Sequence, residues 1–191
     1  MDFGAYIRTL LSVWVGLGLG QLVQALHRLA RFKGVVKWDW IPMTWTALVF
    51  LLFVQTWWAY FFILQSTLWL NLFAFLIPLS IFVIIYLMCA SALPDVTKLA
   101  EGATVDLETF YFAQHRYFFS LWAVVLFLAI VVSVLVRGRL IGADAFRLVA
   151  LAAAVGLASS ANRRLHAGVT VTSVATLIVY IVIYSLRLGR A

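Results

Sequence analysis

Four side chains near the middle of the chain carry the groups best suited to chemistry. Glu108, Tyr111 and His115 follow one another at spacings of three and four residues, and Arg116 comes next. These spacings place the first three on one face of a helix. Such a set could bind a lipid phosphate, or supply an acid and a base at the level of the lipid headgroups. The alternative is a solvated, partly aromatic helix at the membrane interface.

Motifs that would identify an enzyme or a cofactor site are absent from the sequence. It contains no HExxH, no GxSxG, no pair of CxxC motifs and no P-loop. Glu108 and His115 would lie about 10 Å apart along a helix, too far to ligate one metal ion without a third element. We therefore predict neither a cofactor nor a metal site, and the sequence does not favour catalysis.

The composition requires that these residues be carried by a membrane protein. Hydrophobic residues make up 65% of the 191 positions and charged residues only 11%, whereas soluble domains are about one quarter charged. No charged residue occurs between Asp39 and Asp95, and one membrane-spanning helix needs only about 20 apolar residues. Helices satisfy their own backbone groups in lipid, and the apolar runs lack the alternation of a membrane barrel. The predicted fold is an all-α polytopic transmembrane helix bundle, forming a single domain over residues 1–191.

About six spanning helices are predicted, over residues 5–29, 42–64, 68–92, 107–137, 144–164 and 169–188. The fourth is preceded by a plausible N-cap, Asp106, and nothing breaks it before Gly138. Its length of about 45 Å exceeds the hydrocarbon core of a bilayer, so we expect its first turns to extend beyond the membrane. They belong to a polar connecting segment, residues 93–118.

The net charge of +7 is explained by membrane topology better than by nucleic-acid binding. Lys and Arg residues cluster beside helix ends, where they orient helices and meet anionic lipid. The densest cluster, between Arg28 and Lys37, is expected in the cytoplasm, which places both termini in the periplasm. Membrane lipids are thus expected partners, and nucleic acid is not.

Two stripes of small residues predict close helix packing. Gly16 and Gly20 form a GxxxG motif in the first helix, and Ala152, Gly156 and Ser160 repeat the pattern in the fifth. Small side chains let helix backbones approach closely in lipid. We expect these stripes to pack within the chain, and the alternative is the seam of a homodimer.

Five amide side chains lie in or near the predicted spans: Gln21, Gln24, Gln55, Asn71 and Asn162. They could line a path for a polar solute, or they could bridge neighbouring helices at about 0.6 kcal/mol each. No Asp, Glu, Lys or Arg falls near the middle of a predicted span. Proton-coupled transport needs a titratable group within the membrane, so any transport is expected to be passive.

Several short motifs occur along the sequence: Leu93-Pro94-Asp95, Val105-Asp106-Leu107, Phe110-Tyr111-Phe112, His115-Arg116-Tyr117-Phe118-Phe119, the pair Trp57-Trp58 and the basic segment after the first predicted helix. Together they resemble a pattern in an uncharacterised group of small polytopic membrane proteins of bacteria, and the resemblance spans most of the chain. It implies a location in the bacterial inner membrane. It implies no activity and no site residue.

These observations lead to three functional expectations. The first is a passive, channel-like or solute-binding or lipid-binding membrane component, acting as a homo-oligomer. The second is a non-catalytic scaffold or accessory subunit that binds a membrane-protein partner through residues 95–118. The third is an enzyme of lipid headgroups that uses Glu108 and His115.

Overall fold

The computed structural model describes residues 3–64, 67–100, 102–180 and 182. Within these ranges the chain forms six α-helices, two short strands and two 3-10 turns. The helices and strands are α1 (Phe3–Ala30), β1 (Val35–Lys37), α2 (Trp40–Ile63), α3 (Leu72–Ser91), β2 (Thr104–Asp106), α4 (Leu107–Arg137), α5 (Gly142–Ser159) and α6 (Arg163–Tyr180). The predicted all-α bundle is confirmed.

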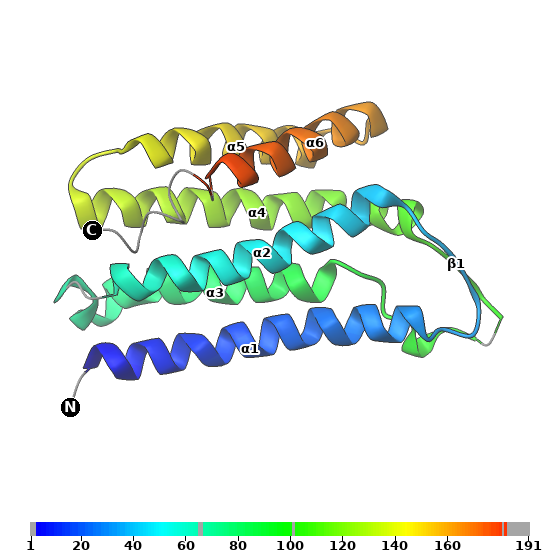
Figure 1. Cartoon of the computed structure of the whole chain (residues 1–191), viewed down its shortest axis with the longest axis horizontal. Coiled ribbons are helices and arrows are strands. Elements are labelled where there is room, and N and C mark those ends of the chain that lie inside the picture. Colours follow the sequence, from blue (N-terminus) through cyan, green and yellow to red (C-terminus); the bar gives the residue numbers. More distant parts are fainter. Residues whose placement is uncertain (1–2, 65–66, 101, 181, 183–191) are drawn as a thin grey trace.

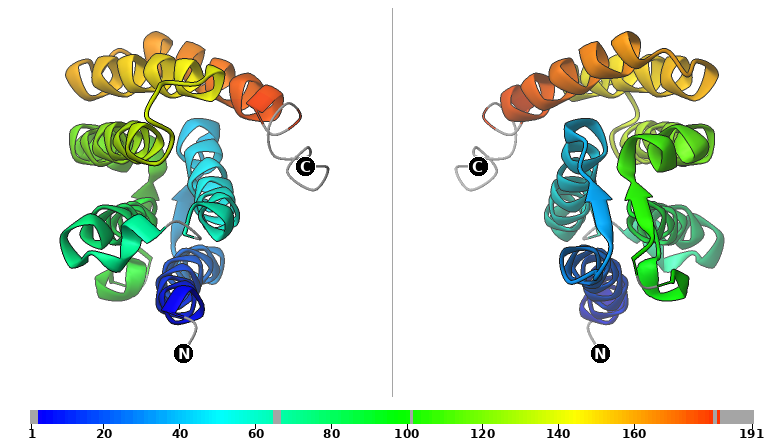
Figure 2. Two further views of the ribbon diagram at one scale, coloured as in Figure 1. Left: turned by 90° about the vertical axis from the view of Figure 1, so that its left-hand side faces the viewer. Right: turned by 90° about the vertical axis from the view of Figure 1, so that its right-hand side faces the viewer.

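The helices run along the long axis of the molecule and alternate in direction (Figure 1). α3 packs against both α1 and α4, and α4 packs most extensively against α5. α5 and α6 form a layer over α2 and α4, with α1 on the far side of the bundle (Figure 2). The loops 31–39, 92–106 and 160–162 lie toward one end, here called the strand end. The first turn of α1, the last turn of α2 and the turn 138–141 lie at the other, here called the cleft end (Figure 1).

Five helices of the described chain are long and apolar enough to cross a membrane. They cover Ala5–Ala30, Trp40–Tyr60, Leu72–Ser91, Leu107–Arg137 and Gly142–Ser159. Large apolar side chains on the outside of the bundle, such as Phe73 at 79% exposure and Val149 at 64%, suit contact with lipid rather than water. The protein is therefore a membrane protein.

The two strands join loops that are far apart in sequence. β1 pairs in parallel with β2, with Val35 opposite Thr104 and Lys37 opposite Asp106. The approach is closest at Gly34, where a Cβ atom would lie 2.1 Å from the carbonyl oxygen of Ala103. Glycine is required there because any side chain would collide with the neighbouring backbone.

The expected bounds of α4 are confirmed. Asp106 caps the helix by accepting a hydrogen bond from the backbone N–H of Thr109, and Gly138 ends it in the left-handed conformation with φ of 68°. α4 has 31 residues, more than the roughly 20 that cross the hydrocarbon core. Leu107, Tyr111 and His115 on its first turns are buried, so the face that carries them packs inside the bundle.

The boundary between the last two helices was predicted wrongly. α5 ends at Ser159, and α6 already begins at Arg163. The side chain of Asn162 accepts a hydrogen bond from the backbone N–H of Arg164, so this amide caps the start of α6. The predicted end of the last helix, at residue 188, lies outside the described residues.

Within the described ranges, the small-residue stripes do not form a close contact between helices. A Cβ atom built on Gly16, Gly20 or Gly156 meets no described atom within 4 Å, Ala152 is exposed, and Ser160 lies beyond the end of α5. The tight position in α1 is Gly18, where a Cβ atom would lie 2.1 Å from the buried ring of Phe53 in α2. The prediction was wrong because helix neighbours, not spacing alone, decide which glycine faces a partner. The homodimer seam stays a prediction.

Candidate functional site

A buried hydrogen-bonded cluster joins α4 to α6 on the strand-end side. The Tyr111 hydroxyl lies 2.7 Å from Nδ1 of His166, and Nε2 of His166 lies 2.7 Å from the carbonyl oxygen of Ser160. Because a carbonyl oxygen only accepts, Nε2 of His166 donates that bond, and in the neutral ring Nδ1 accepts from Tyr111. Both ring nitrogens of this fully buried histidine are thus satisfied.

The same part of α6 is also held by α2. Nε1 of Trp45 donates to the Thr170 hydroxyl at 2.9 Å, and that hydroxyl donates to the carbonyl oxygen of His166 at 2.6 Å. The Trp45 ring packs edge-on against Phe119 of α4, with ring centroids 4.8 Å apart. The first two turns of α6 are therefore anchored on two sides.

His115 lies beside this cluster with one ring nitrogen unused. Its Nδ1 is 2.6 Å from the carbonyl oxygen of Phe112, while Nε2 is buried and has no hydrogen-bond partner in the described part of the chain. The ring centroids of His115 and His166 are 5.7 Å apart. No group of three His, Cys, Asp or Glu residues in the described ranges could hold a metal ion.

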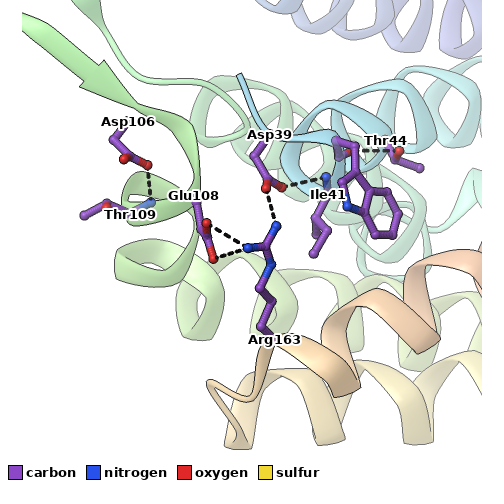
Figure 3. Close-up of polar contacts among 8 residues, drawn as sticks. Asp39, Ile41, Thr44, Asp106, Glu108, Thr109 and Arg163 are labelled. Carbon is purple, nitrogen blue, oxygen red and sulfur yellow. Dashed lines mark hydrogen bonds and ion pairs between the residues drawn. The ribbon is translucent and has the colours of Figure 1, made fainter. Parts of the chain in front are cut away.

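Arg163, at the start of α6, links the loop before α2 to the first turn of α4 at the strand end (Figure 3). Its guanidinium donates to Asp39 at 2.7 Å and to Glu108 at 3.1 Å, and Asp39 also accepts from the backbone N–H of Ile41 at 2.8 Å. Glu108 is thus occupied by an ion pair. Of the four residues singled out in the sequence, only Tyr111 and His115 share the buried cluster, and Arg116 is exposed.

A further ion pair joins the two strands of the sheet. Nζ of Lys37 lies 3.8 Å from Oδ2 of Asp106. The backbone N–H of Thr109, which donates to the Asp106 carboxylate, holds the pKa of that carboxyl below its usual range, and Lys37 acts in the same direction. Both effects favour the charged carboxylate.

A cleft of about 450 Å³ lies between α2, α4, α5 and α6. α4 and α6 meet at Tyr111 and His166, and from Trp122 onward the α4 side chains line the cleft opposite α6. Most of the lining is apolar. Small residues on α5, including Ala150 and Ala153, leave the space unfilled.

A network of polar groups lies where the cleft reaches the cleft end, while Arg164 lines the cleft from the start of α6. Buried Asp144 accepts hydrogen bonds from the Ser133 hydroxyl at 2.9 Å, from the backbone N–H of Ile141 at 2.9 Å, and from Arg147. Nη1 of Arg137 donates to the Ser133 hydroxyl at 3.0 Å. Four polar side chains from α4 and α5 therefore form one connected network beside the cleft.

Tyr60 lies beside this network with an unsatisfied hydroxyl. The residue is 5% exposed, and its oxygen has no hydrogen-bond partner among the described residues. Arg147 is near enough to act electrostatically on the hydroxyl. Tyr60 also borders a second cavity of about 370 Å³, lined from α1, α2 and α3 by residues that include Arg8 and Phe82. It therefore separates two hollow regions at the same end of the bundle.

The five amide side chains singled out in the sequence are not gathered along one path. Gln55 lines the cleft, Asn71 and Asn162 cap the starts of α3 and α6, and Gln24 accepts a hydrogen bond from Arg28 at 3.2 Å. Gln21 is half-buried on α1. Two of the five therefore serve helix starts, a role that asparagine before an apolar run could have indicated.

Sequence reasoning missed the polar network of the cleft and the His166 cluster. Asp144 and Arg147 are three residues apart in a helix, which signals an ion pair. Nothing in the sequence links them to Ser133, or links Tyr111 to His166. Those contacts depend on how α4 packs against α5 and α6.

No protein-family model matches this chain, and neither a curated protein nor a solved structure matches it.

Proposed function

We propose that this membrane protein binds one amphipathic molecule, a lipid or a solute with an apolar chain, in the cleft between α2, α4, α5 and α6. The cleft itself is the observation that carries the proposal. Its volume of about 450 Å³ lies within the range of about 300–1,000 Å³ typical of ligand sites. A mostly apolar lining with a hydrogen-bonded polar network at one end suits a molecule with an apolar chain and a polar head.

The channel-like, enzyme and scaffold expectations are less well supported by the geometry. A continuous polar path would need the amide side chains together, yet Asn71 and Asn162 are at helix starts. A lipid-headgroup enzyme would need Glu108 available, yet Glu108 is ion-paired with Arg163. The scaffold expectation assigns residues 95–118 to a partner, whereas β2 within that segment pairs with β1 of the same chain.

The proposed location is the bacterial inner membrane, with the strand end in the cytoplasm and both termini in the periplasm. The cations Arg28, Arg31 and Lys37 lie toward the strand end and support this orientation. Arg31→Cys in a Cys89→Ala background should resist an impermeant thiol reagent in intact cells. Rapid labelling of that cysteine would reverse the orientation.

Photo-crosslinking tests the binding proposal. The protein in lipid nanodiscs would be mixed with a diazirine analogue of hexadecanol and irradiated. The labelled peptides would then be identified by mass spectrometry. We expect saturable labelling of α4, α5 and α6 residues that line the cleft, reduced at least about tenfold in Ala153→Phe because the added ring fills the space.

Ala152→Phe is the matched control, since Ala152 is the exposed neighbour and does not line the cleft. It should label like the wild type. Labelling that is non-saturable, or that falls only on lipid-facing residues, would refute the proposal. Equal labelling of the two variants would refute it as well.

A further inference from the structure

We propose that the ligand of the cleft is a single-chain amphiphile with an anionic headgroup, and that Arg137, Arg147 and the Tyr60 hydroxyl hold this headgroup. The inference rests on the proposed binding function and adds the chemical class of the ligand. It is carried by three features of the described residues at the cleft end: more arginine than acidic side chains, a guanidinium of Arg137 that uses one of its donors on Ser133, and a buried Tyr60 hydroxyl with no partner among these residues.

The first feature is the sign of the charge. The described residues that line the cleft include three arginines, Arg137, Arg147 and Arg164, and no acidic residue. Asp144 lies behind the lining and pairs with Arg147. Among the described residues of this network, one carboxylate faces two arginines, and this excess of positive side chains favours an anionic ligand.

The second feature is the way the arginines are held. Ser133 bonds to both Asp144 and Arg137, so it connects the two guanidinium groups through one network. The bond from Nη1 of Arg137 to Ser133 uses one of the five donors that a guanidinium carries. The remaining donors suit the paired oxygens of a carboxylate or a phosphate.

The third feature is the Tyr60 hydroxyl. A buried hydroxyl without a hydrogen bond is unfavourable, and Tyr60 is 5% exposed with no partner in the part of the chain that the structure describes. Because Tyr60 and Arg147 both line the cleft and interact electrostatically, an anionic oxygen near Arg147 could accept this hydrogen bond. The same headgroup would then satisfy both residues.

Fatty acids and lysophospholipids both have this chemistry. Each has one apolar chain and a headgroup with anionic oxygens, which arginine binds through charge-assisted hydrogen bonds. One chain is indicated rather than two, because the second cavity at this end lies on the other side of Tyr60.

Competition against the photoreactive hexadecanol tests the headgroup. Palmitic acid at a pH where it is ionised, palmitoyl lysophosphatidic acid and hexadecanol would each compete with the probe in nanodiscs. Their chains have equal length, so the headgroup is the variable. We expect at least one of the two anions to compete about tenfold more strongly than the alcohol. The stronger anion identifies the source as fatty acid or lysophospholipid.

Arg137→Gln should weaken the anion about tenfold and change competition by hexadecanol less than about twofold. Arg139→Gln is the matched control, because Arg139 carries the same charge at the same end but does not line the cleft. Tyr60→Phe should also weaken the anion severalfold while the unliganded protein stays at least as stable, since it removes a hydroxyl that bonds to nothing in the described chain.

Equal competition by the anions and the alcohol would overturn this inference and leave the proposed binding function standing. Unchanged anion competition in Arg137→Gln would overturn it too. A wild-type protein that fails to bind the hexadecanol probe would instead refute the proposed function, so the two failures can be told apart.

Discussion

The two ends of the bundle differ in how their polar groups are used. At the strand end, Arg163 joins Asp39 to Glu108, β1 pairs with β2, and His166 is bonded at both ring nitrogens. At the cleft end, polar groups surround a hollow space, and the buried Tyr60 hydroxyl has no partner within the described ranges.

This difference indicates that the strand end holds the helices in place and that the cleft end provides space for a ligand. Contacts between residues far apart in sequence close the strand end and anchor the start of α6 to α2 and α4. Farther along, α6 and α4 face each other across the cleft. A rigid end that holds the helices in place allows the other end to keep a space for a ligand.

Removing the Asp144 carboxylate should produce the largest loss of stability. Such a loss would show that the cleft end, although hollow, is held together by its polar network. Asp144 is 1% exposed and accepts bonds from Ser133, Ile141 and Arg147. Breaking a buried ion pair costs on the order of 3 kcal/mol, so Asp144→Ala should lower the free energy of unfolding by about that amount in detergent. Asp144→Asn, which keeps the shape, should lose less. If Asp144→Ala were as stable as the wild type, the polar network would not stabilise the cleft end.

Tyr111→Phe tests whether the strand end is held by the buried cluster. The change leaves Nδ1 of His166 without its partner, and an unsatisfied buried acceptor costs about 1–3 kcal/mol. Chemical unfolding of the variant should show this loss. Tyr117→Phe, at a residue that is 49% exposed, should show none. Equal stability of the two variants would show that the cluster does not anchor α6.

Alanine substitutions at two glycines compare the tolerance of the packed part of the bundle with that of the cleft. Gly18→Ala should destabilise the protein by about 1–3 kcal/mol, because the new Cβ atom collides with the buried Phe53 ring. Gly168→Ala should not destabilise it, since Gly168 lines the cleft and a Cβ atom there meets no atom of the described residues within 4 Å. The melting temperatures of both variants in one detergent check this contrast. A larger loss for Gly168→Ala would mean that the cleft is filled.

The smallest expected effect concerns Asp106 at the strand end. Its pKa is lower in the folded protein because the Thr109 backbone N–H stabilises the carboxylate. The resulting stabilisation is present above the unfolded pKa, about 3.9, and is lost as the pH falls through the lower folded pKa.

Asp106→Asn keeps a cap but removes this charge. The wild type should therefore melt above the variant near neutral pH, and the gap should close in acid as the Asp106 carboxylate is protonated. A difference in melting temperature that does not change with pH would contradict the claim that the charged Asp106 carboxylate stabilises the folded protein.

The sequence predicted those parts of the structure that follow from composition and local signals. Uncharged runs predicted the helices, and Asp106 and Gly138 predicted the bounds of α4. The sequence could not show that Gly18 rather than Gly16 or Gly20 faces another helix. It also could not show that Arg163 reaches Asp39, 124 residues away. Such contacts depend on the packing of distant helices, and the candidate site is built almost entirely from them.

The most direct test of the central claim is an experimental structure of the wild-type protein crystallised from a lipid mesophase, with palmitic acid or lysophosphatidic acid added. We expect elongated density between α4 and α6, ending in a headgroup within hydrogen-bond distance of Arg137, Arg147 and the Tyr60 hydroxyl. A cleft that is collapsed, or that holds only water with Tyr60 bonded elsewhere in the chain, would contradict it.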